Sequence, residues 1–88
     1  MHINQSINAF PNPFTGNSGI TFKSDKEIHA LNITDINGKN VFSAQKINNT
    51  SLFWNGKSGS GKELSTGVYI LESINNFNPE RIIILKSE

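Results

Sequence analysis

Apolar and polar residues alternate along this chain in short segments, and apolar residues at helical spacing are hard to find. Clusters of Asn, Gly, Pro and Ser separate the segments about every ten residues, as turns do between short strands. This rhythm is typical of an all-β sandwich or barrel. The pattern predicts seven strands, near residues 6–10, 19–24, 28–34, 40–46, 51–54, 67–74 and 81–86.

Local details refine this prediction. In "ITDINGKNVF" the pair Asn37-Gly38 stands between two alternating stretches, and both residues accept positive φ, so a hairpin is expected there. Ile28 is at an even position and Leu31 and Ile33 are at odd positions, so in a regular strand they would point to opposite faces. A β-bulge near 29–30 would place all three on the same face. The expected fold is a seven-stranded antiparallel immunoglobulin-like β-sandwich without substantial helix. The residues assigned to its turns and core are Asp35, Asn37, Gly38, Trp54, Gly56 and Gly61.

The strand "GVYILESI" is apolar on both faces. Val68, Ile70 and Ile74 share one face, and Tyr69, Leu71 and Ser73 share the other. A strand of this kind is either covered on both sides or meets a partner with its outer face. The sequence leaves both interpretations open.

Large aromatic residues are available to fill the space between two sheets. Trp54 is expected at the centre of the core, with its indole N–H bonded to a backbone carbonyl. Core packing is the expected role of all the aromatic residues considered, namely Phe10, Phe14, Phe22, Phe42, Phe53, Trp54 and Tyr69.

Composition limits the function classes. The 88 residues predict one small domain, with residues 1–5 as a lead or linker segment, or residues added for expression, and 6–88 as the domain. A formal net charge of +1 without a basic run gives no electrostatic case for nucleic acid or membrane surfaces. The chain has no cysteine, and its longest apolar run, 82–85, is far too short for a membrane span. No cofactor and no metal site are expected.

The stretch "GKSGSGKE" has the glycine and lysine spacing of a phosphate-binding loop. Such a loop needs a Ser or Thr after the lysine as a magnesium ligand, and a helix whose N-terminus faces the phosphates. Glu63 follows Lys62, and a turn and a strand follow Glu63. These glycines are therefore predicted to form a turn.

The order of the motifs resembles a known family. "FWNGKSGSGKELSTGVYIL" follows "INAFPNPFTGNSGITF" and "LNITDINGKNV", and "RIIILK" closes the chain. This arrangement resembles the type A C-terminal sorting domain of the type IX secretion system in Bacteroidota, over about residues 7–86. The chain departs modestly from the family pattern at Phe10, Thr34, Asn55 and Arg81.

The resemblance implies a non-catalytic sorting signal fused to an N-terminal cargo domain. It implies transit through the periplasm, binding by the outer-membrane translocon and shuttle components, removal by a sortase-like protease, and release or surface attachment of the cargo. No nucleic acid or membrane insertion is expected, and an isolated domain with an unpaired strand edge is a candidate homodimer. The residues assigned to recognition are Pro11, Asn12, Pro13, Gly67, Tyr69, Arg81, Ile84, Leu85 and Lys86.

Several of these residues also have a purely structural interpretation. The prolines of 11–13 fix φ and remove N–H donors, so they form a rigid corner in which Asn12 bonds the backbone. Gly67 is expected in a conformation closed to other residues. Tyr69 is either a core tyrosine or an exposed ring, whereas for Lys86 the resemblance favours a contact with the secretion machinery over a solvated strand end.

Catalysis finds no support in the sequence. The two histidines and the scattered carboxylates and serines form no pair or triad that spacing alone would bring together. The rival interpretation is a binding module for carbohydrate or for a surface protein. A carbohydrate module is expected to expose a coplanar pair of aromatic rings on one face, whereas a sorting domain needs none.

Overall fold

A computed structural model describes residues 7–75 and 78–87, and all helix or strand in that part of the chain is β-strand. The strands are β1 (Ile7–Phe10), β2 (Ile20–Asp35), β3 (Asn40–Trp54), β4 (Gly67–Asn75) and β5 (Asn78–Lys86). Every pair of neighbouring strands is antiparallel. The predicted antiparallel all-β class is therefore confirmed, whereas the predicted segment 1–5 lies outside the described residues.

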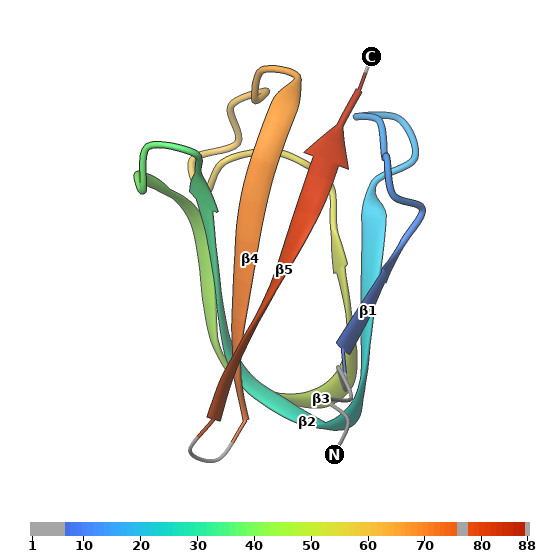
Figure 1. The fold of residues 1–88 in the computed structure, drawn as a ribbon, viewed down its shortest axis with the longest axis vertical. Coiled ribbons are helices and arrows are strands. Elements are labelled where there is room, and N and C mark those ends of the chain that lie inside the picture. Colours follow the sequence, from blue (N-terminus) through green and yellow to red (C-terminus); the bar gives the residue numbers. More distant parts are fainter. Residues whose placement is uncertain (1–6, 76–77, 88) are drawn as a thin grey trace, which may run out of the picture.

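The five strands form one curled sheet. β3 follows one edge of β2, while the other edge of β2 pairs with β1 at its start and with β4 at its end. β5 pairs with β4. Figure 1 shows β2 and β3 bending together, so that the limb with β1 faces the limb with β4 and β5. The core lies between these two limbs.

The predicted count of seven strands is wrong for the described chain, which has five. The segments 19–24 and 28–34 belong to the single strand β2, and 40–46 and 51–54 belong to β3. The immunoglobulin-like sandwich is not confirmed either. The residues between these predicted strands, 25–27 and 47–50, were expected to connect them, but they lie inside bent strands.

Irregular pairing lets β2 and β3 bend without breaking. The register shifts between Lys23 and Ile28, and again between Ile28 and Ala30, and on the partner strand Lys46 and Asn48 have positive φ of 56° and 49°. Bulges of this kind bend a strand and increase its twist. Ile28, Leu31 and Ile33 are all buried despite their different parity, which confirms the expected irregularity near 29–30.

The hairpin at Asn37-Gly38 is also confirmed, with one difference in its geometry. Only Gly38 has positive φ, 86°. Asp35 closes the turn, because its backbone N–H donates to Lys39 O and its carboxylate accepts from the N–H groups of Asn37 and Lys39. This matches the hairpin loop in which a turn is followed by one left-handed residue.

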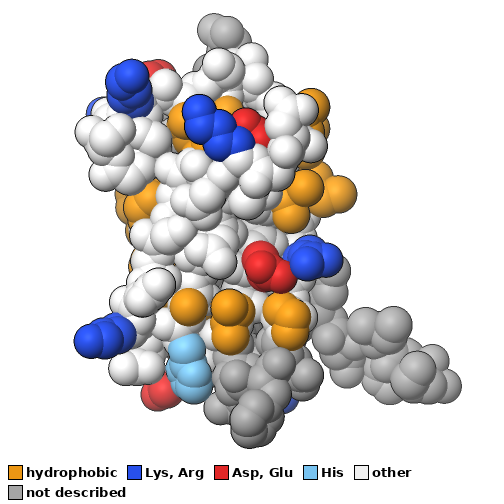
Figure 2. Space-filling view, turned by 90° about the vertical axis from the view of Figure 1, so that its left-hand side faces the viewer, with side chains coloured by type: hydrophobic (Ala, Val, Ile, Leu, Met, Phe, Trp, Pro, Cys, Tyr) orange, Lys and Arg blue, Asp and Glu red, His pale blue; other side chains and the backbone are white. Residues whose placement is uncertain are grey.

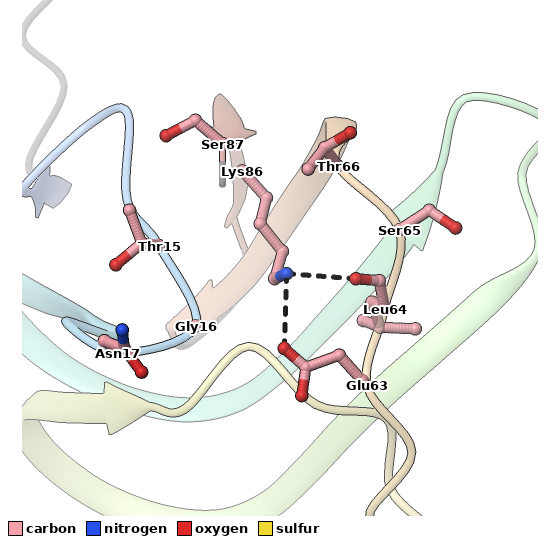
Figure 3. A pocket seen from close by; sticks show the side chains of 9 residues that line it. All are labelled: Thr15, Gly16, Asn17, Glu63, Leu64, Ser65, Thr66, Lys86 and Ser87. Atoms are coloured by element: carbon pink, nitrogen blue, oxygen red, sulfur yellow. Dashed lines mark hydrogen bonds and ion pairs between the residues drawn. The ribbon is translucent and has the colours of Figure 1, made fainter.

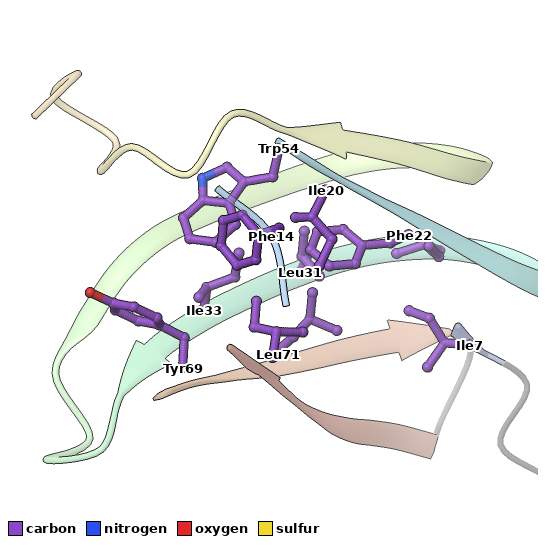
Figure 4. Packing of buried hydrophobic residues seen from close by; sticks show 11 residues of the cluster. Ile7, Phe14, Ile20, Phe22, Leu31, Ile33, Trp54, Tyr69 and Leu71 are labelled. Atoms are coloured by element: carbon purple, nitrogen blue, oxygen red, sulfur yellow. The ribbon is translucent and has the colours of Figure 1, made fainter. Parts of the chain in front are cut away.

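The core is filled from both limbs of the sheet (Figure 4). Its buried apolar members are Ile7, Phe14, Ile20, Phe22, Ile28, Leu31, Ile33, Trp54, Tyr69, Leu71 and Ile84. The central place predicted for Trp54 is confirmed, and its indole Nε1–H donates to Lys57 O at 2.8 Å. The expectation that every aromatic lies in the core is wrong for Phe10 and Phe53, which are 48% and 60% exposed.

Candidate functional site: a corner where two distant segments meet

The segment 11–14 lies along the outer edge of β5. The Asn12 side chain donates to Ile83 O at 3.1 Å and accepts from Leu85 N at 2.9 Å. Phe14 continues the contact, because its N–H donates to Leu85 O and its carbonyl accepts from Ser87 N. Asn12 was expected to bond the backbone of its own bend, but it bonds a strand 71 residues away. The corner therefore covers an edge that would otherwise be open to pairing.

Replacing Asn12 by alanine should weaken the cover over this edge, although the backbone hydrogen bonds of Phe14 remain. The substitution removes one donor and one acceptor, and two hydrogen bonds together contribute about 1–3 kcal/mol to the free energy of unfolding. Urea denaturation of the variant should show that loss, whereas Asn17→Ala in the neighbouring loop serves as the control. A denaturation midpoint equal to that of the unchanged domain would contradict this role of Asn12.

Trp54 and the turn that follows it pack against Phe14, the last residue of this segment. The indole packs against the rings of Phe14, Phe42 and Tyr69, with centroids at 5.6, 5.8 and 6.4 Å. Gly56 has a φ of 81°, which favours glycine. A Cβ on Gly56 would also lie 3.1 Å from the Phe14 ring, so glycine allows the turn to pack closely against the core.

Lys86, at the end of the last strand, lies beside the turn at Gly56. Its side chain is only 5% exposed. Its ammonium donates to Leu64 O at 3.0 Å and lies 3.7 Å from Glu63 Oε2, as Figure 3 shows. These groups border a polar pocket of about 390 Å³. Its lining residues are Thr15, Gly16, Asn17, Glu63, Leu64, Ser65, Thr66, Lys86 and Ser87.

The glycine-rich stretch before Glu63 forms a turn, as predicted. Ser58 N–H donates to Lys62 O, Gly61 N–H donates to Ser58 O, and Gly61 has a φ of 90°. No helix follows it in the described chain, although a phosphate-binding loop requires one. The stretch instead brings Glu63 to Lys86.

The start of β4 directly follows the pocket-lining residues 63–66. Gly67 has a φ of 148°, which confirms the conformation predicted for it. The Tyr69 ring is buried in the core, and its hydroxyl donates to Ser65 O at 2.6 Å. Burial, and to a smaller extent the nearby Asp35 carboxylate, raises the pKa of Tyr69 above 10.0 because both disfavour the phenolate.

The raised pKa of Tyr69 predicts a loss of stability in alkali. A group with a raised folded-state pKa stabilises the fold fully below its unfolded pKa of about 10, and this contribution is lost as the pH rises through the folded pKa. Tyr69→Phe should remove this part of the pH dependence and cost about 0.5–1.5 kcal/mol at neutral pH. Melting curves across this pH range test the prediction, and identical alkaline profiles for the two proteins would contradict it.

The outer face of β4 and β5 is apolar. The register places Val68 opposite Leu85 and Ile70 opposite Ile83. Val68, Leu85 and Ile83 are all exposed, Ile83 by 67%. The Arg81–Glu72 ion pair, at 3.2 Å, stands beside them in the next outward-facing pair. Of the two interpretations of "GVYILESI", the structure matches a strand whose outer face is left uncovered.

The predicted recognition residues divide into two groups. Pro11, Asn12, Pro13, Arg81 and Leu85 are exposed, while Tyr69, Ile84 and Lys86 are buried and Gly67 is partly buried. Their part in recognition stays a prediction. Sequence reasoning missed Val68 and Ile83 as surface residues, although the two apolar faces of "GVYILESI" were a signal for Val68. It also missed the pairing of Glu63 with Lys86.

A pair of aromatic rings stands on the outer face of the other limb. Phe10 and Phe53 both pair with Thr21, from opposite sides of β2, so the two exposed rings share one face of the sheet. Two strand spacings place their backbones about 10 Å apart. The next row across this face carries Asn8, Lys23 and Ser51.

Other kinds of site find little support in the described residues. They contain no group of three or more His, Asp or Glu side chains able to hold a metal ion. None of the described structure is a helix with the length and hydropathy needed to cross a membrane. On the face drawn in Figure 2, hydrophobic side chains stand in small groups separated by polar surface, and no continuous basic surface is visible.

Comparison with known proteins agrees with this geometry. A family model described as "Secretion system C-terminal sorting domain" matches residues 8–85. A solved structure of PorZ, an essential bacterial surface component of the type IX secretion system of Porphyromonas gingivalis, has the same fold, with a TM-score of 0.77 and 20% identity. The match covers 93% of this chain and 11% of the PorZ chain. No curated protein matches the chain.

Proposed function

Because the chain belongs to the family of secretion system C-terminal sorting domains, we propose that it directs an attached cargo protein across the outer membrane through the type IX translocon. The family is one of sorting signals, so the domain acts by being bound. We propose no chemical step within it.

The observation that carries this proposal is the uncovered aliphatic face of the last two strands. Val68, Ile83 and Leu85 are large apolar residues left exposed, next to the Arg81–Glu72 pair. Covering one such side chain with a partner contributes about 1.5–3 kcal/mol when burial is complete. An apolar patch with a polar rim is the usual form of a protein-binding surface. The proposed translocon contact is therefore this face, and the corner at 11–14 holds β5 in place beneath it.

The remaining steps belong to the same proposal, which the family match supports. The domain and its cargo cross the inner membrane by the general route, and the domain folds in the periplasm. The translocon and its shuttle components then bind it. A sortase-like protease removes it afterwards, and the cargo is released or joined to the cell surface.

A reporter fusion tests the proposal. A periplasmic reporter joined to the N-terminal side of the domain should reach the medium of a type IX-competent host. Removing 81–88 deletes most of β5 and should retain the reporter inside the cell. Equal export with and without this segment would count against the proposed function.

The pair Phe10 and Phe53 favours one second candidate function, binding of carbohydrate. Two exposed rings on the same face of a sheet can stack on sugar rings, and Asn8, Lys23 and Ser51 offer hydrogen bonds beside them. Co-sedimentation of the domain with insoluble polysaccharides such as chitin and cellulose tests this candidate. Binding that falls at least tenfold in a Phe10→Ala, Phe53→Ala double variant would support it, and no binding by the unchanged domain would exclude it for these polysaccharides.

A further inference from the structure

The ammonium of Lys86 is a buried charge beside the loop 63–66. Its side chain is 5% exposed, and the described residues give the ammonium one hydrogen bond, to Leu64 O at 3.0 Å. Glu63, 67% exposed, faces it from the rim at 3.7 Å. A buried charge is tolerated where it is paired and hydrogen-bonded. A partner on the surface would have to break this arrangement to contact the ammonium directly.

The chain around Lys86 leaves room for its side chain. A Cβ on Gly56 would lie 3.4 Å from Lys86 Cε, and one on Gly16 would lie 2.7 Å from Glu63 Oε2. A side chain at Gly56 would therefore only touch the lysine, whereas one at Gly16 would displace the exposed Glu63 carboxylate. Two loops distant in sequence, 15–17 and 63–66, line the pocket beside one side chain from the last strand (Figure 3).

The contact also connects the loop 63–66 to the proposed translocon surface. β4 begins at Gly67, directly after this loop, and Gly67 pairs with Lys86. The next pair is Val68 with Leu85, whose side chains belong to the uncovered aliphatic face. A loop released from Lys86 would loosen the start of β4 and with it this pair.

We infer that Lys86 is a positioning residue for secretion, which acts by holding the loop 63–66 against the end of β5. The partner binds the outer face of β4 and β5, which the contact between Lys86 and the loop holds in place. The ammonium itself stays buried. This inference rests on the proposed function, because it assigns a cause to the export that the domain directs. It gives a physical reason for a lysine near the end of an apolar strand.

The test compares three variants of the full-length fusion in a type IX-competent host, together with hydrogen exchange of each purified domain. Lys86→Met keeps the aliphatic part of the side chain and removes the ammonium. In this variant the backbone amides of residues 64–68 should exchange about tenfold faster. The reason is that loss of a hydrogen bond to a charged group raises the equilibrium constant for local opening by about that factor. Export should fall by a similar factor. Lys62→Met, at an exposed lysine of the preceding turn, should change neither measurement.

Lys86→Arg supplies the conservative variant. Its guanidinium can still donate to Leu64 O and pair with Glu63, so slow exchange and export should both be retained. Lost export of a folded Lys86→Met domain with unchanged exchange at 64–68 would overturn the inference, because the ammonium would then be contacted directly. Faster exchange with unchanged export would overturn it as well. Failure of the unchanged fusion to leave the cell would overturn the proposed function itself. This outcome is distinguishable from failure of the inference on Lys86, because it is seen without any substitution.

Discussion

Replacing Trp54 by alanine is expected to lower the free energy of unfolding by about 3–5 kcal/mol, the range for large aromatic residues removed from a core. The indole is fully buried, contacts three other rings and donates a hydrogen bond to Lys57 O. Domains generally have only about 5–15 kcal/mol of stability in total, and a small one lies towards the lower end. The melting temperature should therefore fall by more than ~12 °C, and export of a fusion should fall with it.

The neighbouring residue supplies a matched control. Phe53 is an aromatic residue of the same strand, but it is 60% exposed. Phe53→Ala should change stability by less than about 1 kcal/mol, as is usual for surface positions. Calorimetry of the two variants under the same conditions separates core packing from simple loss of an aromatic ring. Equal shifts in the two melting temperatures would contradict the place given to Trp54.

Placing charges on the outer face of β5 should have the second large effect. A double variant, Ile83→Glu and Leu85→Glu, puts two carboxylates where an apolar partner surface is proposed, and buried unpaired charges are costly at an interface. Export of the fusion should fall at least tenfold, which corresponds to about 1.4 kcal/mol of binding free energy. The melting temperature should change little, because both side chains point away from the core.

Secretion assays and calorimetry together decide this prediction. Gln45→Glu adds a charge at an exposed position of β3, which β2 separates from β4, and should leave export unchanged. Normal export of the folded double variant would show that the aliphatic face is not the bound surface. A large loss of stability would show that these side chains are part of the core after all.

Local sequence signals predicted local structure well. The Asn37-Gly38 pair marked a hairpin, the changed parity at Ile28 marked an irregular pairing, and the indole of Trp54 marked the centre of the core. Each of these depends on residues close in sequence or on burial alone. The glycine-rich turn was predicted in the same way, since Glu63 and the following strand already argued against a phosphate-binding loop.

Long-range contacts could not be predicted. The partners of Asn12 are backbone atoms of β5 more than 70 residues away, and nothing in the local pattern of "PNP" specifies them. Lys86 is the last residue of an apolar strand, where a charged residue would ordinarily be solvated, and only the folded chain shows Leu64 O within reach of its ammonium. The strand count failed for a related reason, because polar stretches inside β2 and β3 look like turns although irregular pairing carries the strands through them.

The most direct test of the central claim compares one fusion in two hosts. A reporter followed by this domain is expressed in a type IX-competent strain and in the same strain without the translocon, and the reporter is measured in the medium and inside the cells. The account predicts that the reporter reaches the medium only in the competent strain. Equal amounts in the two media, or retention of the reporter in both strains, would contradict it.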